Sequence, residues 1–283
     1  MYVQKNSHAG MFVVAVFHFC LYNCMAEENS FRLATFNIRR PGDKSPHSWR
    51  ERKSRCLEII RQNKIDIYGI QEGYHYQVKD LTDNGVFRYI GHGRNDFKEK
   101  GEFTAILYKK DRFELLEGGT FGLSEKPHIP GYRSWKSAYP RIASWGLFKD
   151  KKSGRKFLYY NTHLDNVREL ARINGIKLIM DHAEKNAPGT PVVLSGDFND
   201  VPDSPTWKMA SSFLKDSSRI SRKDHIGPLY TFHDYGKEKS PSPIDFIFVS
   251  NTFTVLEHQT IDTKFPEGFA SDHFPVAVTL LLK

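Results

Sequence analysis

The sequence predicts an α/β domain, and three observations support that prediction. Short apolar segments bounded by turn residues, such as Pro191–Leu194, are typical of buried strands. Between them lie segments with an apolar stripe at helical spacing, such as residues 166–186. Of the 283 residues, 39% are hydrophobic and 13% aromatic, which is enough to bury a sizeable core. We therefore expect one large folded domain over residues 27–283.

The N-terminal segment is typical of a secretory signal peptide. Lys5 and His8 precede an apolar run over residues 11–19, which is too short to span a bilayer. Ala26 ends a small-x-small pattern of the kind that is cleaved after export. We expect residues 1–26 to be removed and the protein to be secreted or otherwise extracytoplasmic. A buried N-terminal strand or an uncleaved anchor is the alternative.

The rest of the chain is basic and contains one cysteine. Cys20 and Cys24 fall within the expected signal peptide, so Cys56 stays alone and no internal disulfide is expected. Cys56 lies on the apolar side of an expected helix, which favours a packed thiol over a nucleophile. The net charge of +8 favours an anionic partner such as nucleic acid or a membrane surface. A basic soluble surface without such a partner explains the charge equally well.

Local patterns predict the elements in chain order. Residues 31–37 alternate apolar and polar side chains, which predicts a strand. Ser48 and Glu51 form a capping box that opens a helix over about 49–63, and the apolar run 65–70 predicts the next strand. The further elements expected are a helix over 74–84, strands over 86–90, 103–109 and 112–117, a loop over 118–140, strands over 142–148 and 157–162, a helix over 166–186, a strand over 191–194, a helix over 205–213, a loop over 216–243, and strands over 244–249 and 276–282.

Polar side chains collect where the expected strands end or begin. Taken singly, an Asp, Asn or His at such a place is more often a turn former, a salt-bridge partner or a structural histidine. Asp245 lies in so apolar a strand that it needs a partner, and His273 is the natural one. Because open α/β sheets keep their sites at such edges, the whole set marks a candidate active site. Its members are Asn37, Glu72, His163, Asp165, Asp197, Asn199, Asp245, Asp272 and His273.

The first of the two long loops mixes aromatic and basic side chains. A loop of this length is usually functional or disordered. Tyr132 and Trp135 suit stacking on nucleic-acid bases, and Arg141, directly after the loop, suits pairing with phosphates. The alternative is that the aromatic residues only fix the loop to the core. We count Tyr132, Trp135 and Arg141, together with Asp165 and Arg172, as candidate substrate-binding residues.

At six places the sequence resembles the motifs of the endonuclease/exonuclease/phosphatase (DNase I-like) superfamily. The resemblance extends over residues 31–283, and its Thr-His-Leu-Asp form is most similar to the branch with nocturnin-like and deadenylase nucleases and exported bacterial members. The sequence departs from the apurinic-site endonuclease branch, which has a tyrosine-containing segment in place of His163 and Asp165. It also lacks the disulfides of secreted DNase I. The resembling motifs are Thr35–Asn37, Ile70–Glu72, Asn161–Asp165, Ser195–Asn199, Ile244–Val249 and Ser271–Pro275.

The resemblance implies a fold and a metal. The fold is a four-layer α/β (α+β) sandwich, in which two packed mixed β-sheets are flanked by helices and the site lies where their loops meet. Carboxylate and amide oxygens are hard donors, which suit Mg²⁺ or Mn²⁺ better than zinc. We expect Glu72 to be the direct ligand, with Asn37 and Asp272 beside it.

Roles for the remaining motif residues follow from their chemistry. Asp197 and Asn199 would orient the attacking water and hold the phosphate. Asp245 would fix the tautomer of His273 and stabilise its imidazolium. His163 would bind the phosphate from the other side. Either Asp197 or His273 could take the proton of the water, and the sequence leaves both open.

These features predict a secreted, metal-dependent phosphodiester hydrolase. The preferred interpretation is a monomeric nuclease that acts on RNA or DNA, such as a 3′–5′ exonuclease, without an obligate protein partner. Three alternatives stay open: a sphingomyelinase-like phospholipid phosphodiesterase, a phosphomonoesterase acting on inositol or sugar phosphates, and a binding protein with an inactive site. Every expected site position holds a competent residue, which argues against the last of these.

Overall fold

Two six-stranded β-sheets form the centre of the computed structural model, which describes residues 29–237 and 240–283. The first sheet comprises β1 (Phe31–Asn37), β2 (Ile67–Gln71), β3 (Phe87–Ile90), β4 (Ile106–Lys109), β11 (Phe253–Thr260) and β12 (Val276–Leu282). The second comprises β5 (Phe113–Gly122), β6 (Ile142–Asp150), β7 (Lys156–His163), β8 (Val192–Asp197), β9 (Lys215–Asp216) and β10 (Asp245–Val249). Their strand orders are β11-β12-β1-β2-β4-β3 and β5-β6-β7-β8-β10-β9. Each sheet contains both parallel and antiparallel pairs.

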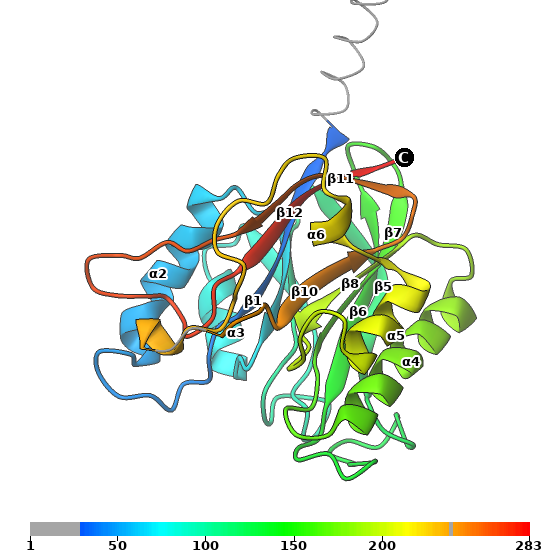
Figure 1. Cartoon of the computed structure of the whole chain (residues 1–283), viewed down its shortest axis with the longest axis horizontal. Coiled ribbons are helices and arrows are strands. Elements are labelled where there is room, and N and C mark those ends of the chain that lie inside the picture. Colours follow the sequence, from blue (N-terminus) through cyan, green and yellow to red (C-terminus); the bar gives the residue numbers. More distant parts are fainter. Residues whose placement is uncertain (1–28, 238–239) are drawn as a thin grey trace, which may run out of the picture.

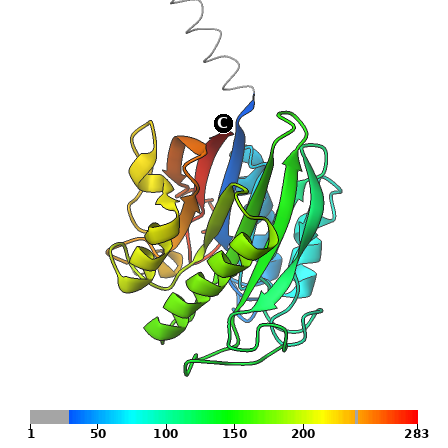
Figure 2. The same cartoon turned by 90° about the vertical axis from the view of Figure 1, so that its right-hand side faces the viewer.

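Helices cover the outer faces of the two sheets, so the molecule has four layers (Figures 1 and 2). The first sheet is covered by α2 (Trp49–Gln62) and α3 (His75–Thr82), and the second by α4 (Glu169–Asn186) and α5 (Pro205–Phe213). Two short helical turns, α6 (Ser217–Ile220) and η1 (Asp234–Gly236), lie in the connections. The predicted four-layer sandwich of two mixed sheets is therefore confirmed.

Three apolar cores hold the layers together. The core between the sheets is rich in phenylalanine: the ring of Phe31 stacks on Phe157 at a centroid distance of 5.2 Å and meets Phe113 edge-on at 5.3 Å. Strand β1 shows how one sequence serves two cores. Leu33 points into the core between the sheets, whereas Phe36 packs beneath the helices, because successive side chains of a strand point to opposite faces.

The strand register brings polar strand ends to one edge of both sheets. In the parallel pair β7–β8, His163 lies opposite Asp197. In the antiparallel pair β10–β8, Asp245 lies opposite the same Asp197. Asn37 ends β1 beside the end of β2 in the first sheet. The central strands β1 and β8 pack on each other, so these ends converge although they come from different sheets.

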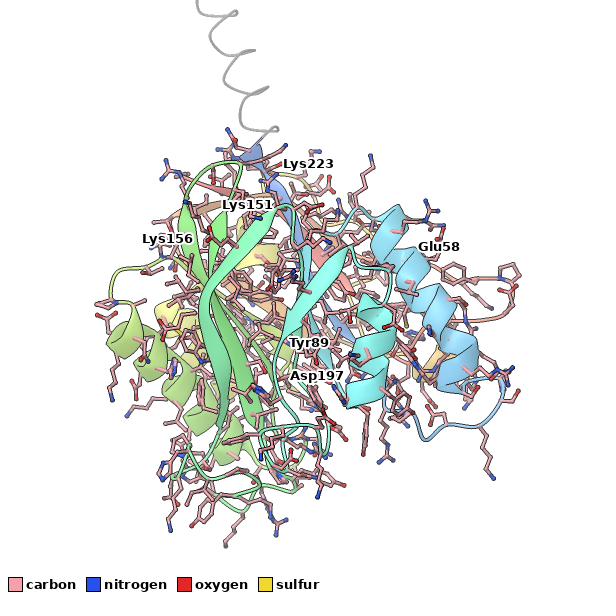
Figure 3. All side chains as sticks on the ribbon, turned by 180° about the vertical axis from the view of Figure 1, so that it is seen from behind. Glu58, Tyr89, Lys151, Lys156, Asp197 and Lys223 are labelled. Atoms are coloured by element: carbon pink, nitrogen blue, oxygen red, sulfur yellow. The ribbon has the colours of Figure 1, made fainter. Side chains whose placement is uncertain are left out.

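The opposite end of the sandwich carries the start of the first strand and the end of the last one. Phe31 pairs with Leu280 there. In Figure 3, Lys151 and Lys156 lie toward that end, away from Asp197. Positive charge is therefore spread over the molecule rather than confined to the edge with the polar strand ends.

A buried asparagine links the two sheets at the polar edge. Asn161 on β7 donates hydrogen bonds to the backbone oxygens of Ile70 (2.8 Å) and Ala105 (3.1 Å) in the first sheet. Its own oxygen accepts from Gln71 at 2.7 Å. Gly69 makes room for this contact, because a Cβ there would lie 2.3 Å from the amide carbon of Asn161. Asn161 directly precedes Thr162 and His163 on β7, so its hydrogen bonds to the first sheet help to position these two residues.

Two strands differ most from the expectation. Strand β11 was not among the expected strands, and β5 continues to Gly122, into the segment expected to be a loop from residue 118. Both contain a β-bulge, between Val255 and Glu257 in β11 and between Leu115 and Glu117 in β5. A bulge breaks the two-residue alternation from which strands are predicted. The short strand β9 was not expected either, and the expected loop over 216–243 contains α6 and η1. Boundaries elsewhere differ by a few residues: α3 ends at Thr82, α4 begins at Glu169 and β4 begins at Ile106.

Further expectations concern the chain termini and Cys56. The expected signal peptide, with Cys20 and Cys24, lies outside the described residues. Within residues 29–237 and 240–283, no helix combines the length and the apolar character needed to cross a membrane. Cys56 is free and buried, and burial raises the pKa of its thiol to about 11. A thiol in this state is packed and unreactive, as expected.

Candidate active site

A cleft of about 410 Å³ opens at the edge where the polar strand ends meet. It contains most of the expected site residues, and Asn37 and Asp245 lie buried beneath its floor. The volume is in the range of small-molecule sites. The cleft is lined by Arg39, Arg40, Glu72, Arg94, Glu102, Tyr139, Arg141, His163, Asn166, Asp197, Asn199, Phe232, Ile244, Asp272 and His273.

His273 is held by Asp245 from behind, as the sequence predicted. Nδ1 of His273 lies 2.9 Å from Oδ2 of Asp245, and Nε2 faces Oδ2 of Asp197 at 3.9 Å. Burial lowers the pKa of His273, but the nearby charge and hydrogen bond of Asp245 outweigh it and raise the pKa to about 10. The ring is therefore an imidazolium at neutral pH, and it presents a positive charge to the cleft.

Asp197 lies at the centre of the site. Its Oδ2 accepts a hydrogen bond from the side-chain amide of Asn37 at 3.0 Å and lies 3.6 Å from Nε2 of His163. Its Oδ1 accepts the backbone N–H of Asn199 at 2.9 Å. Asn199 has a φ of 49°, a left-handed conformation that turns the chain back over the carboxylate. These contacts fix both oxygens of Asp197.

The pKa of Asp197 lies close to neutral pH. Burial and the nearby Asp245 raise it to about 7, although the positive charge of His273 opposes the shift. A carboxylate with this pKa can accept a proton near pH 7, whereas His273 is already protonated there. The structure therefore favours Asp197 as the proton acceptor of the two candidates that the sequence left open.

His163 and Arg141 form the opposite wall. Burial and the charges of Arg141 and Arg94 lower the pKa of His163 well below its usual value, so this imidazole is neutral. Arg141 donates from Nη2 to Asn166 at 3.1 Å, and its buried Nε has no hydrogen-bond partner among the described residues. That Nε faces Oδ2 of Asp165 at 3.7 Å as an ion pair. A guanidinium in the cleft wall beside a neutral histidine is suited to binding an anion.

Glu72 and Asp272 supply carboxylates on the side of the first sheet. Glu72 accepts from the side-chain amide of Asn37 at 3.2 Å and from the backbone N–H of Arg40 at 3.1 Å. Burial alone would raise the pKa of Glu72, but the charge of His273 and these hydrogen bonds lower it below its usual value. Glu72 is therefore ionised, and it adopts a left-handed φ of 62° that aims it into the cleft.

Of the three expected metal ligands, Glu72 and Asp272 fit a hard divalent cation better than Asn37 does. Ionised Glu72 and buried Asp272 offer carboxylate oxygens to the same cleft, which is the donor chemistry of Mg²⁺ or Mn²⁺. The oxygen of Asn37 instead accepts the backbone N–H of Arg39 at 3.0 Å, so its amide nitrogen faces the carboxylates. In this structure Asn37 therefore orients the acids and does not offer a third oxygen to a metal ion.

A second group of possible metal ligands has its own explanation. One ligand atom each from Asp197, Asp245 and His273 lies within 4.8 Å of the others. The hydrogen bond between Asp245 and His273 accounts for this closeness without an ion.

Two expected substrate-binding residues are occupied within the protein. Asp165 is buried and accepts the backbone N–H groups of Ala138 and Arg168 at 2.9 and 2.8 Å. Arg172 donates from Nε to Asp200 at 3.0 Å and from Nη1 to the backbone oxygen of Asp165 at 3.0 Å. Neither side chain lines the cleft. In this structure they shape the loops around it.

The two expected stacking aromatics also lie outside the cleft. Tyr132 has Lys126 over its ring at 5.0 Å, and half-buried Trp135 sits in a left-handed turn with a φ of 53°. Of the expected substrate-binding residues, the structure thus places Arg141 alone in the cleft lining.

The sequence reasoning missed an ion pair in the wall of the cleft. Arg94 binds Glu102 through two hydrogen bonds of 2.7 and 3.1 Å, and its guanidinium lies over the ring of Tyr139 at 5.1 Å. The pair closes a tight loop between β3 and β4. Glycines near both ends of a charged stretch, Gly93 and Gly101, were the available clue to such a loop. Arg39 and Arg40, which follow β1, were missed as well.

The fold and the site define a two-sheet α/β protein whose cleft combines buried acids, histidines and arginines. The chain belongs to the Endonuclease/Exonuclease/phosphatase family, whose pattern matches residues 34–273. Members of this family hydrolyse phosphate esters and use divalent metal ions.

Several known proteins are similar to the chain. A family member from Bacteroides vulgatus has a crystal structure that is 35% identical, with a TM-score of 0.86 over 90% of this chain and 99% of that one. A mannosyl-6-phosphatase from Bacteroides thetaiotaomicron is 32% identical, with a TM-score of 0.83 over 89% and 100% of the two chains. The human nocturnin catalytic domain, at 20% identity and a TM-score of 0.71 over 90% and 95%, shares the fold.

One curated relative is an exoribonuclease subunit. The 3′–5′-exoribonuclease subunit Ccr4 of Mycosarcoma maydis is 23% identical over 298 residues, which cover 81% of this chain. The chain spans only 44% of that relative's length.

Proposed function

We propose that the protein is a metal-dependent phosphatase that hydrolyses small phosphate monoesters, with a sugar phosphate as the substrate class. The observation that carries this proposal is the cleft: about 410 Å³ in volume, with Arg94, Glu102 and Arg141 in its wall beside His163. Arginines suit a phosphate, and a paired Arg and Glu suit hydroxyl groups. The mannosyl-6-phosphatase, which matches 89% of this chain, supports the same class.

The residues of the cleft support an in-line displacement. Asp197 accepts a proton from a water molecule, whose oxygen attacks phosphorus while the bond from phosphorus to the leaving oxygen breaks, and the leaving oxygen takes up a proton from solvent. The imidazolium of His273 and the guanidinium of Arg141 bind the phosphoryl oxygens, and neutral His163 holds them from the same wall. A divalent ion on Glu72 would offset charge on the phosphoryl and leaving oxygens.

A nuclease is the second candidate function, and it was the preferred interpretation of the sequence. The net charge of +8 and the similarity to an exoribonuclease subunit support it. Tyr132 and Trp135, on which that interpretation partly depended, lie outside the cleft, and Tyr139 is the aromatic residue of the same loop that lines it. A lipid substrate has no comparable support.

The test is a substrate panel with purified protein and Mg²⁺. We expect release of inorganic phosphate from mannose 6-phosphate, and loss of that activity in Asp197→Ala. Asp203→Ala is the matched control, because Asp203 is an exposed acid near the same loop. Cleavage of labelled single-stranded RNA or duplex DNA, without phosphate release from sugar phosphates, would replace the proposal with the nuclease. Hydrolysis of sphingomyelin vesicles alone would replace both.

We also propose that the protein works outside the cytoplasm. The charged, apolar and small-residue segments of residues 1–26 support this location. N-terminal sequencing of the protein recovered from its native host should begin near Glu27. A native chain that begins at Met1 would contradict the proposal.

A further inference from the structure

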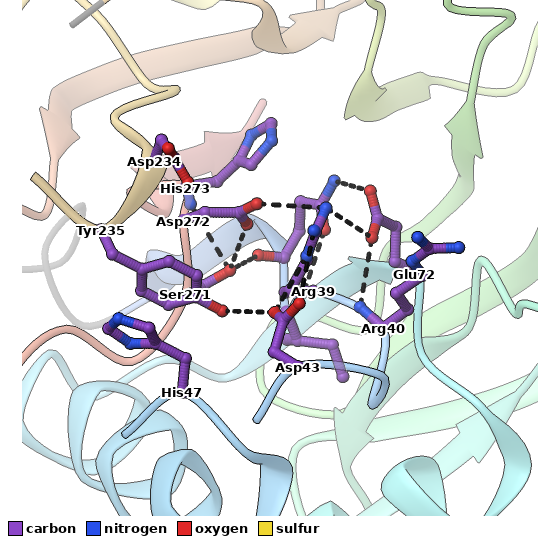
Figure 4. A network of polar contacts seen from close by, with 12 residues as sticks. Arg39, Arg40, Asp43, His47, Glu72, Asp234, Tyr235, Ser271, Asp272 and His273 are labelled. Carbon is purple, nitrogen blue, oxygen red and sulfur yellow. Dashed lines mark hydrogen bonds and ion pairs between the residues drawn. The ribbon is translucent and has the colours of Figure 1, made fainter. Parts of the chain in front are cut away.

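The guanidinium of Arg39 lies between two carboxylates of the cleft (Figure 4). Its Nη1 is 3.3 Å from Oδ2 of Asp272 and 3.9 Å from Oε2 of Glu72. A cation that bridged two acidic side chains would occupy this place. Arg39 lies two residues beyond Asn37, the last residue of β1. Its backbone has a φ of 59°, a left-handed conformation that a non-glycine residue keeps when its surroundings hold it.

Asp43 holds Arg39 from behind. It accepts from Nε of Arg39 at 3.1 Å and from Nη2 at 3.4 Å. Oδ2 of Asp43 also accepts the hydroxyl of Tyr235 at 3.0 Å, and the Tyr235 ring stacks on His47 at a centroid distance of 3.8 Å. Figure 4 shows this series of contacts from His47 to Arg39. An ordinary surface ion pair joins one basic side chain to one acidic side chain. Arg39 instead is hydrogen-bonded to Asp43, and its Nη1 faces the carboxylates of both Glu72 and Asp272.

We propose that Arg39 is the fixed second cation of this site, holding the place between Glu72 and Asp272 so that the site binds a single divalent ion, on Glu72. The inference rests on the proposed metal-dependent hydrolysis and concerns how this chain supplies positive charge to it. In this arrangement Asp272 is the partner of the guanidinium rather than a metal ligand, which revises its expected role.

The chemistry of arginine explains what such a residue would do. A guanidinium stays charged at every working pH and offers several N–H donors in one plane, which match the oxygens of a phosphate. A second divalent ion at the same place would be repelled by it at short range. Arg39 therefore contributes a permanent positive charge to phosphate binding, and it limits the number of ions.

The test counts metal ions rather than turnover. The purified full chain is stripped with chelator and titrated with Mn²⁺, and bound ions are counted by electron paramagnetic resonance and calorimetry. We expect one ion per wild-type chain and two per chain of Arg39→Gln. We expect the double variant Arg39→Gln with Asp272→Asn to return to one. Arg61→Gln is the matched control, because Arg61 is an exposed arginine that pairs with Glu58 on α2, and this variant should bind one ion.

A second variant avoids any dependence on the folding of Arg39→Gln. In the wild-type background, Asp272→Asn should still bind one Mn²⁺ ion per chain, because the proposed ion lies on Glu72 and Asp272 serves Arg39. Failure of this variant to bind an ion at Mn²⁺ concentrations well above those that saturate the wild type, as expected if Asp272 were a ligand of that ion, would overturn the proposal.

The remaining outcomes are also decisive. Two ions on the wild-type chain, or one ion on Arg39→Gln at any affinity, would show that the guanidinium does not hold a second cation place. A wild-type chain that binds no Mn²⁺ would contradict the metal site of the proposed function as well. The two failures are thus distinguishable from the wild-type titration alone.

Discussion

Oδ2 of Asp245 lies 2.9 Å from Nδ1 of His273, beneath the floor of the cleft. The same Asp245 lies opposite Asp197 in the register of β10 and β8. One buried acid therefore faces a histidine and a second acid. The negative charge of Asp245 raises the pKa of both neighbours, which favours the charged form of His273 and the neutral form of Asp197. The two residues therefore have different roles: His273 is positive at neutral pH, and Asp197 can take a proton there.

The activity should depend on pH with two limbs. Asp197 acts as a base when ionised, so the rate should rise as the pH increases through about 7. The His273 imidazolium binds phosphate while protonated, so the rate should fall as the pH increases through about 10. A profile of kcat/KM from pH 5 to 11 measures both limbs. A rate that stays constant from pH 6 to 8 would contradict the role of Asp197.

Replacing Asp245 by Asn should move the alkaline limb. The change removes the charge that raises the pKa of His273, so the fall in rate should occur at lower pH than in the wild type. The imidazole also loses its fixed tautomer, and we expect kcat to fall about 10²–10⁴-fold. Asp262→Asn, at an exposed acid, is the control. An unshifted alkaline limb would show that Asp245 does not set the charge of His273.

The sequence predicted the centre of this site because its residues follow local patterns. Asn37, His163 and Asp197 each end an apolar strand, and parallel strands of one sheet must end at the same edge. The pairing of Asp245 with His273 followed from the cost of leaving an acid alone in an apolar strand. Short-range pattern and elementary electrostatics were sufficient for these residues.

The outer parts of the site depend on features without a local pattern. Arg94 and Glu102 meet through a loop closure, and Arg39 is placed by a left-handed turn and by Asp43. Tyr132 and Trp135 were expected to bind substrate on composition alone, but the position of their loop is set by packing and by the backbone contacts of Asp165, and it is Tyr139 that lines the cleft. Composition indicates which partners a side chain can bind, but it does not indicate where in the folded protein the loop places that side chain.

Removal of the metal ion should abolish activity and leave the fold intact. We expect no turnover in excess chelator and recovery on adding Mg²⁺ or Mn²⁺, because Glu72 would hold the ion that offsets charge on phosphate. Glu72→Gln should weaken Mn²⁺ binding in a titration, whereas Glu58→Gln, at an acid on the outer face of α2, should not. Full activity in chelator would contradict the metal-dependent mechanism.

The Arg94–Glu102 pair should determine affinity for the substrate rather than the chemical step. Removing both charges with Arg94→Gln and Glu102→Gln leaves neither partner as an unpaired charge, so the fold should persist. We expect KM to rise about 10–100-fold with kcat little changed, since a charged hydrogen bond is worth about 1.5–3 kcal/mol. Steady-state kinetics on a sugar phosphate measure the change, with Arg88→Gln as an exposed control. A fall in kcat at constant KM would exclude a binding role.

The Asn161 link between the sheets should carry a measurable share of stability. Asn161→Leu has a similar volume but loses the hydrogen bonds to the backbone oxygens of Ile70 and Ala105 and to the side chain of Gln71. All of these groups are buried, and we expect the free energy of unfolding to fall by about 2–4 kcal/mol. Urea unfolding monitored by tryptophan fluorescence measures the loss, and Asn251→Leu, in an exposed turn, provides the comparison. Because Asn161 also helps to position His163 on the same strand, we expect the activity of Asn161→Leu to be lower than that of the wild type under native conditions. An unchanged urea midpoint would show that the sheets are held by their apolar core alone.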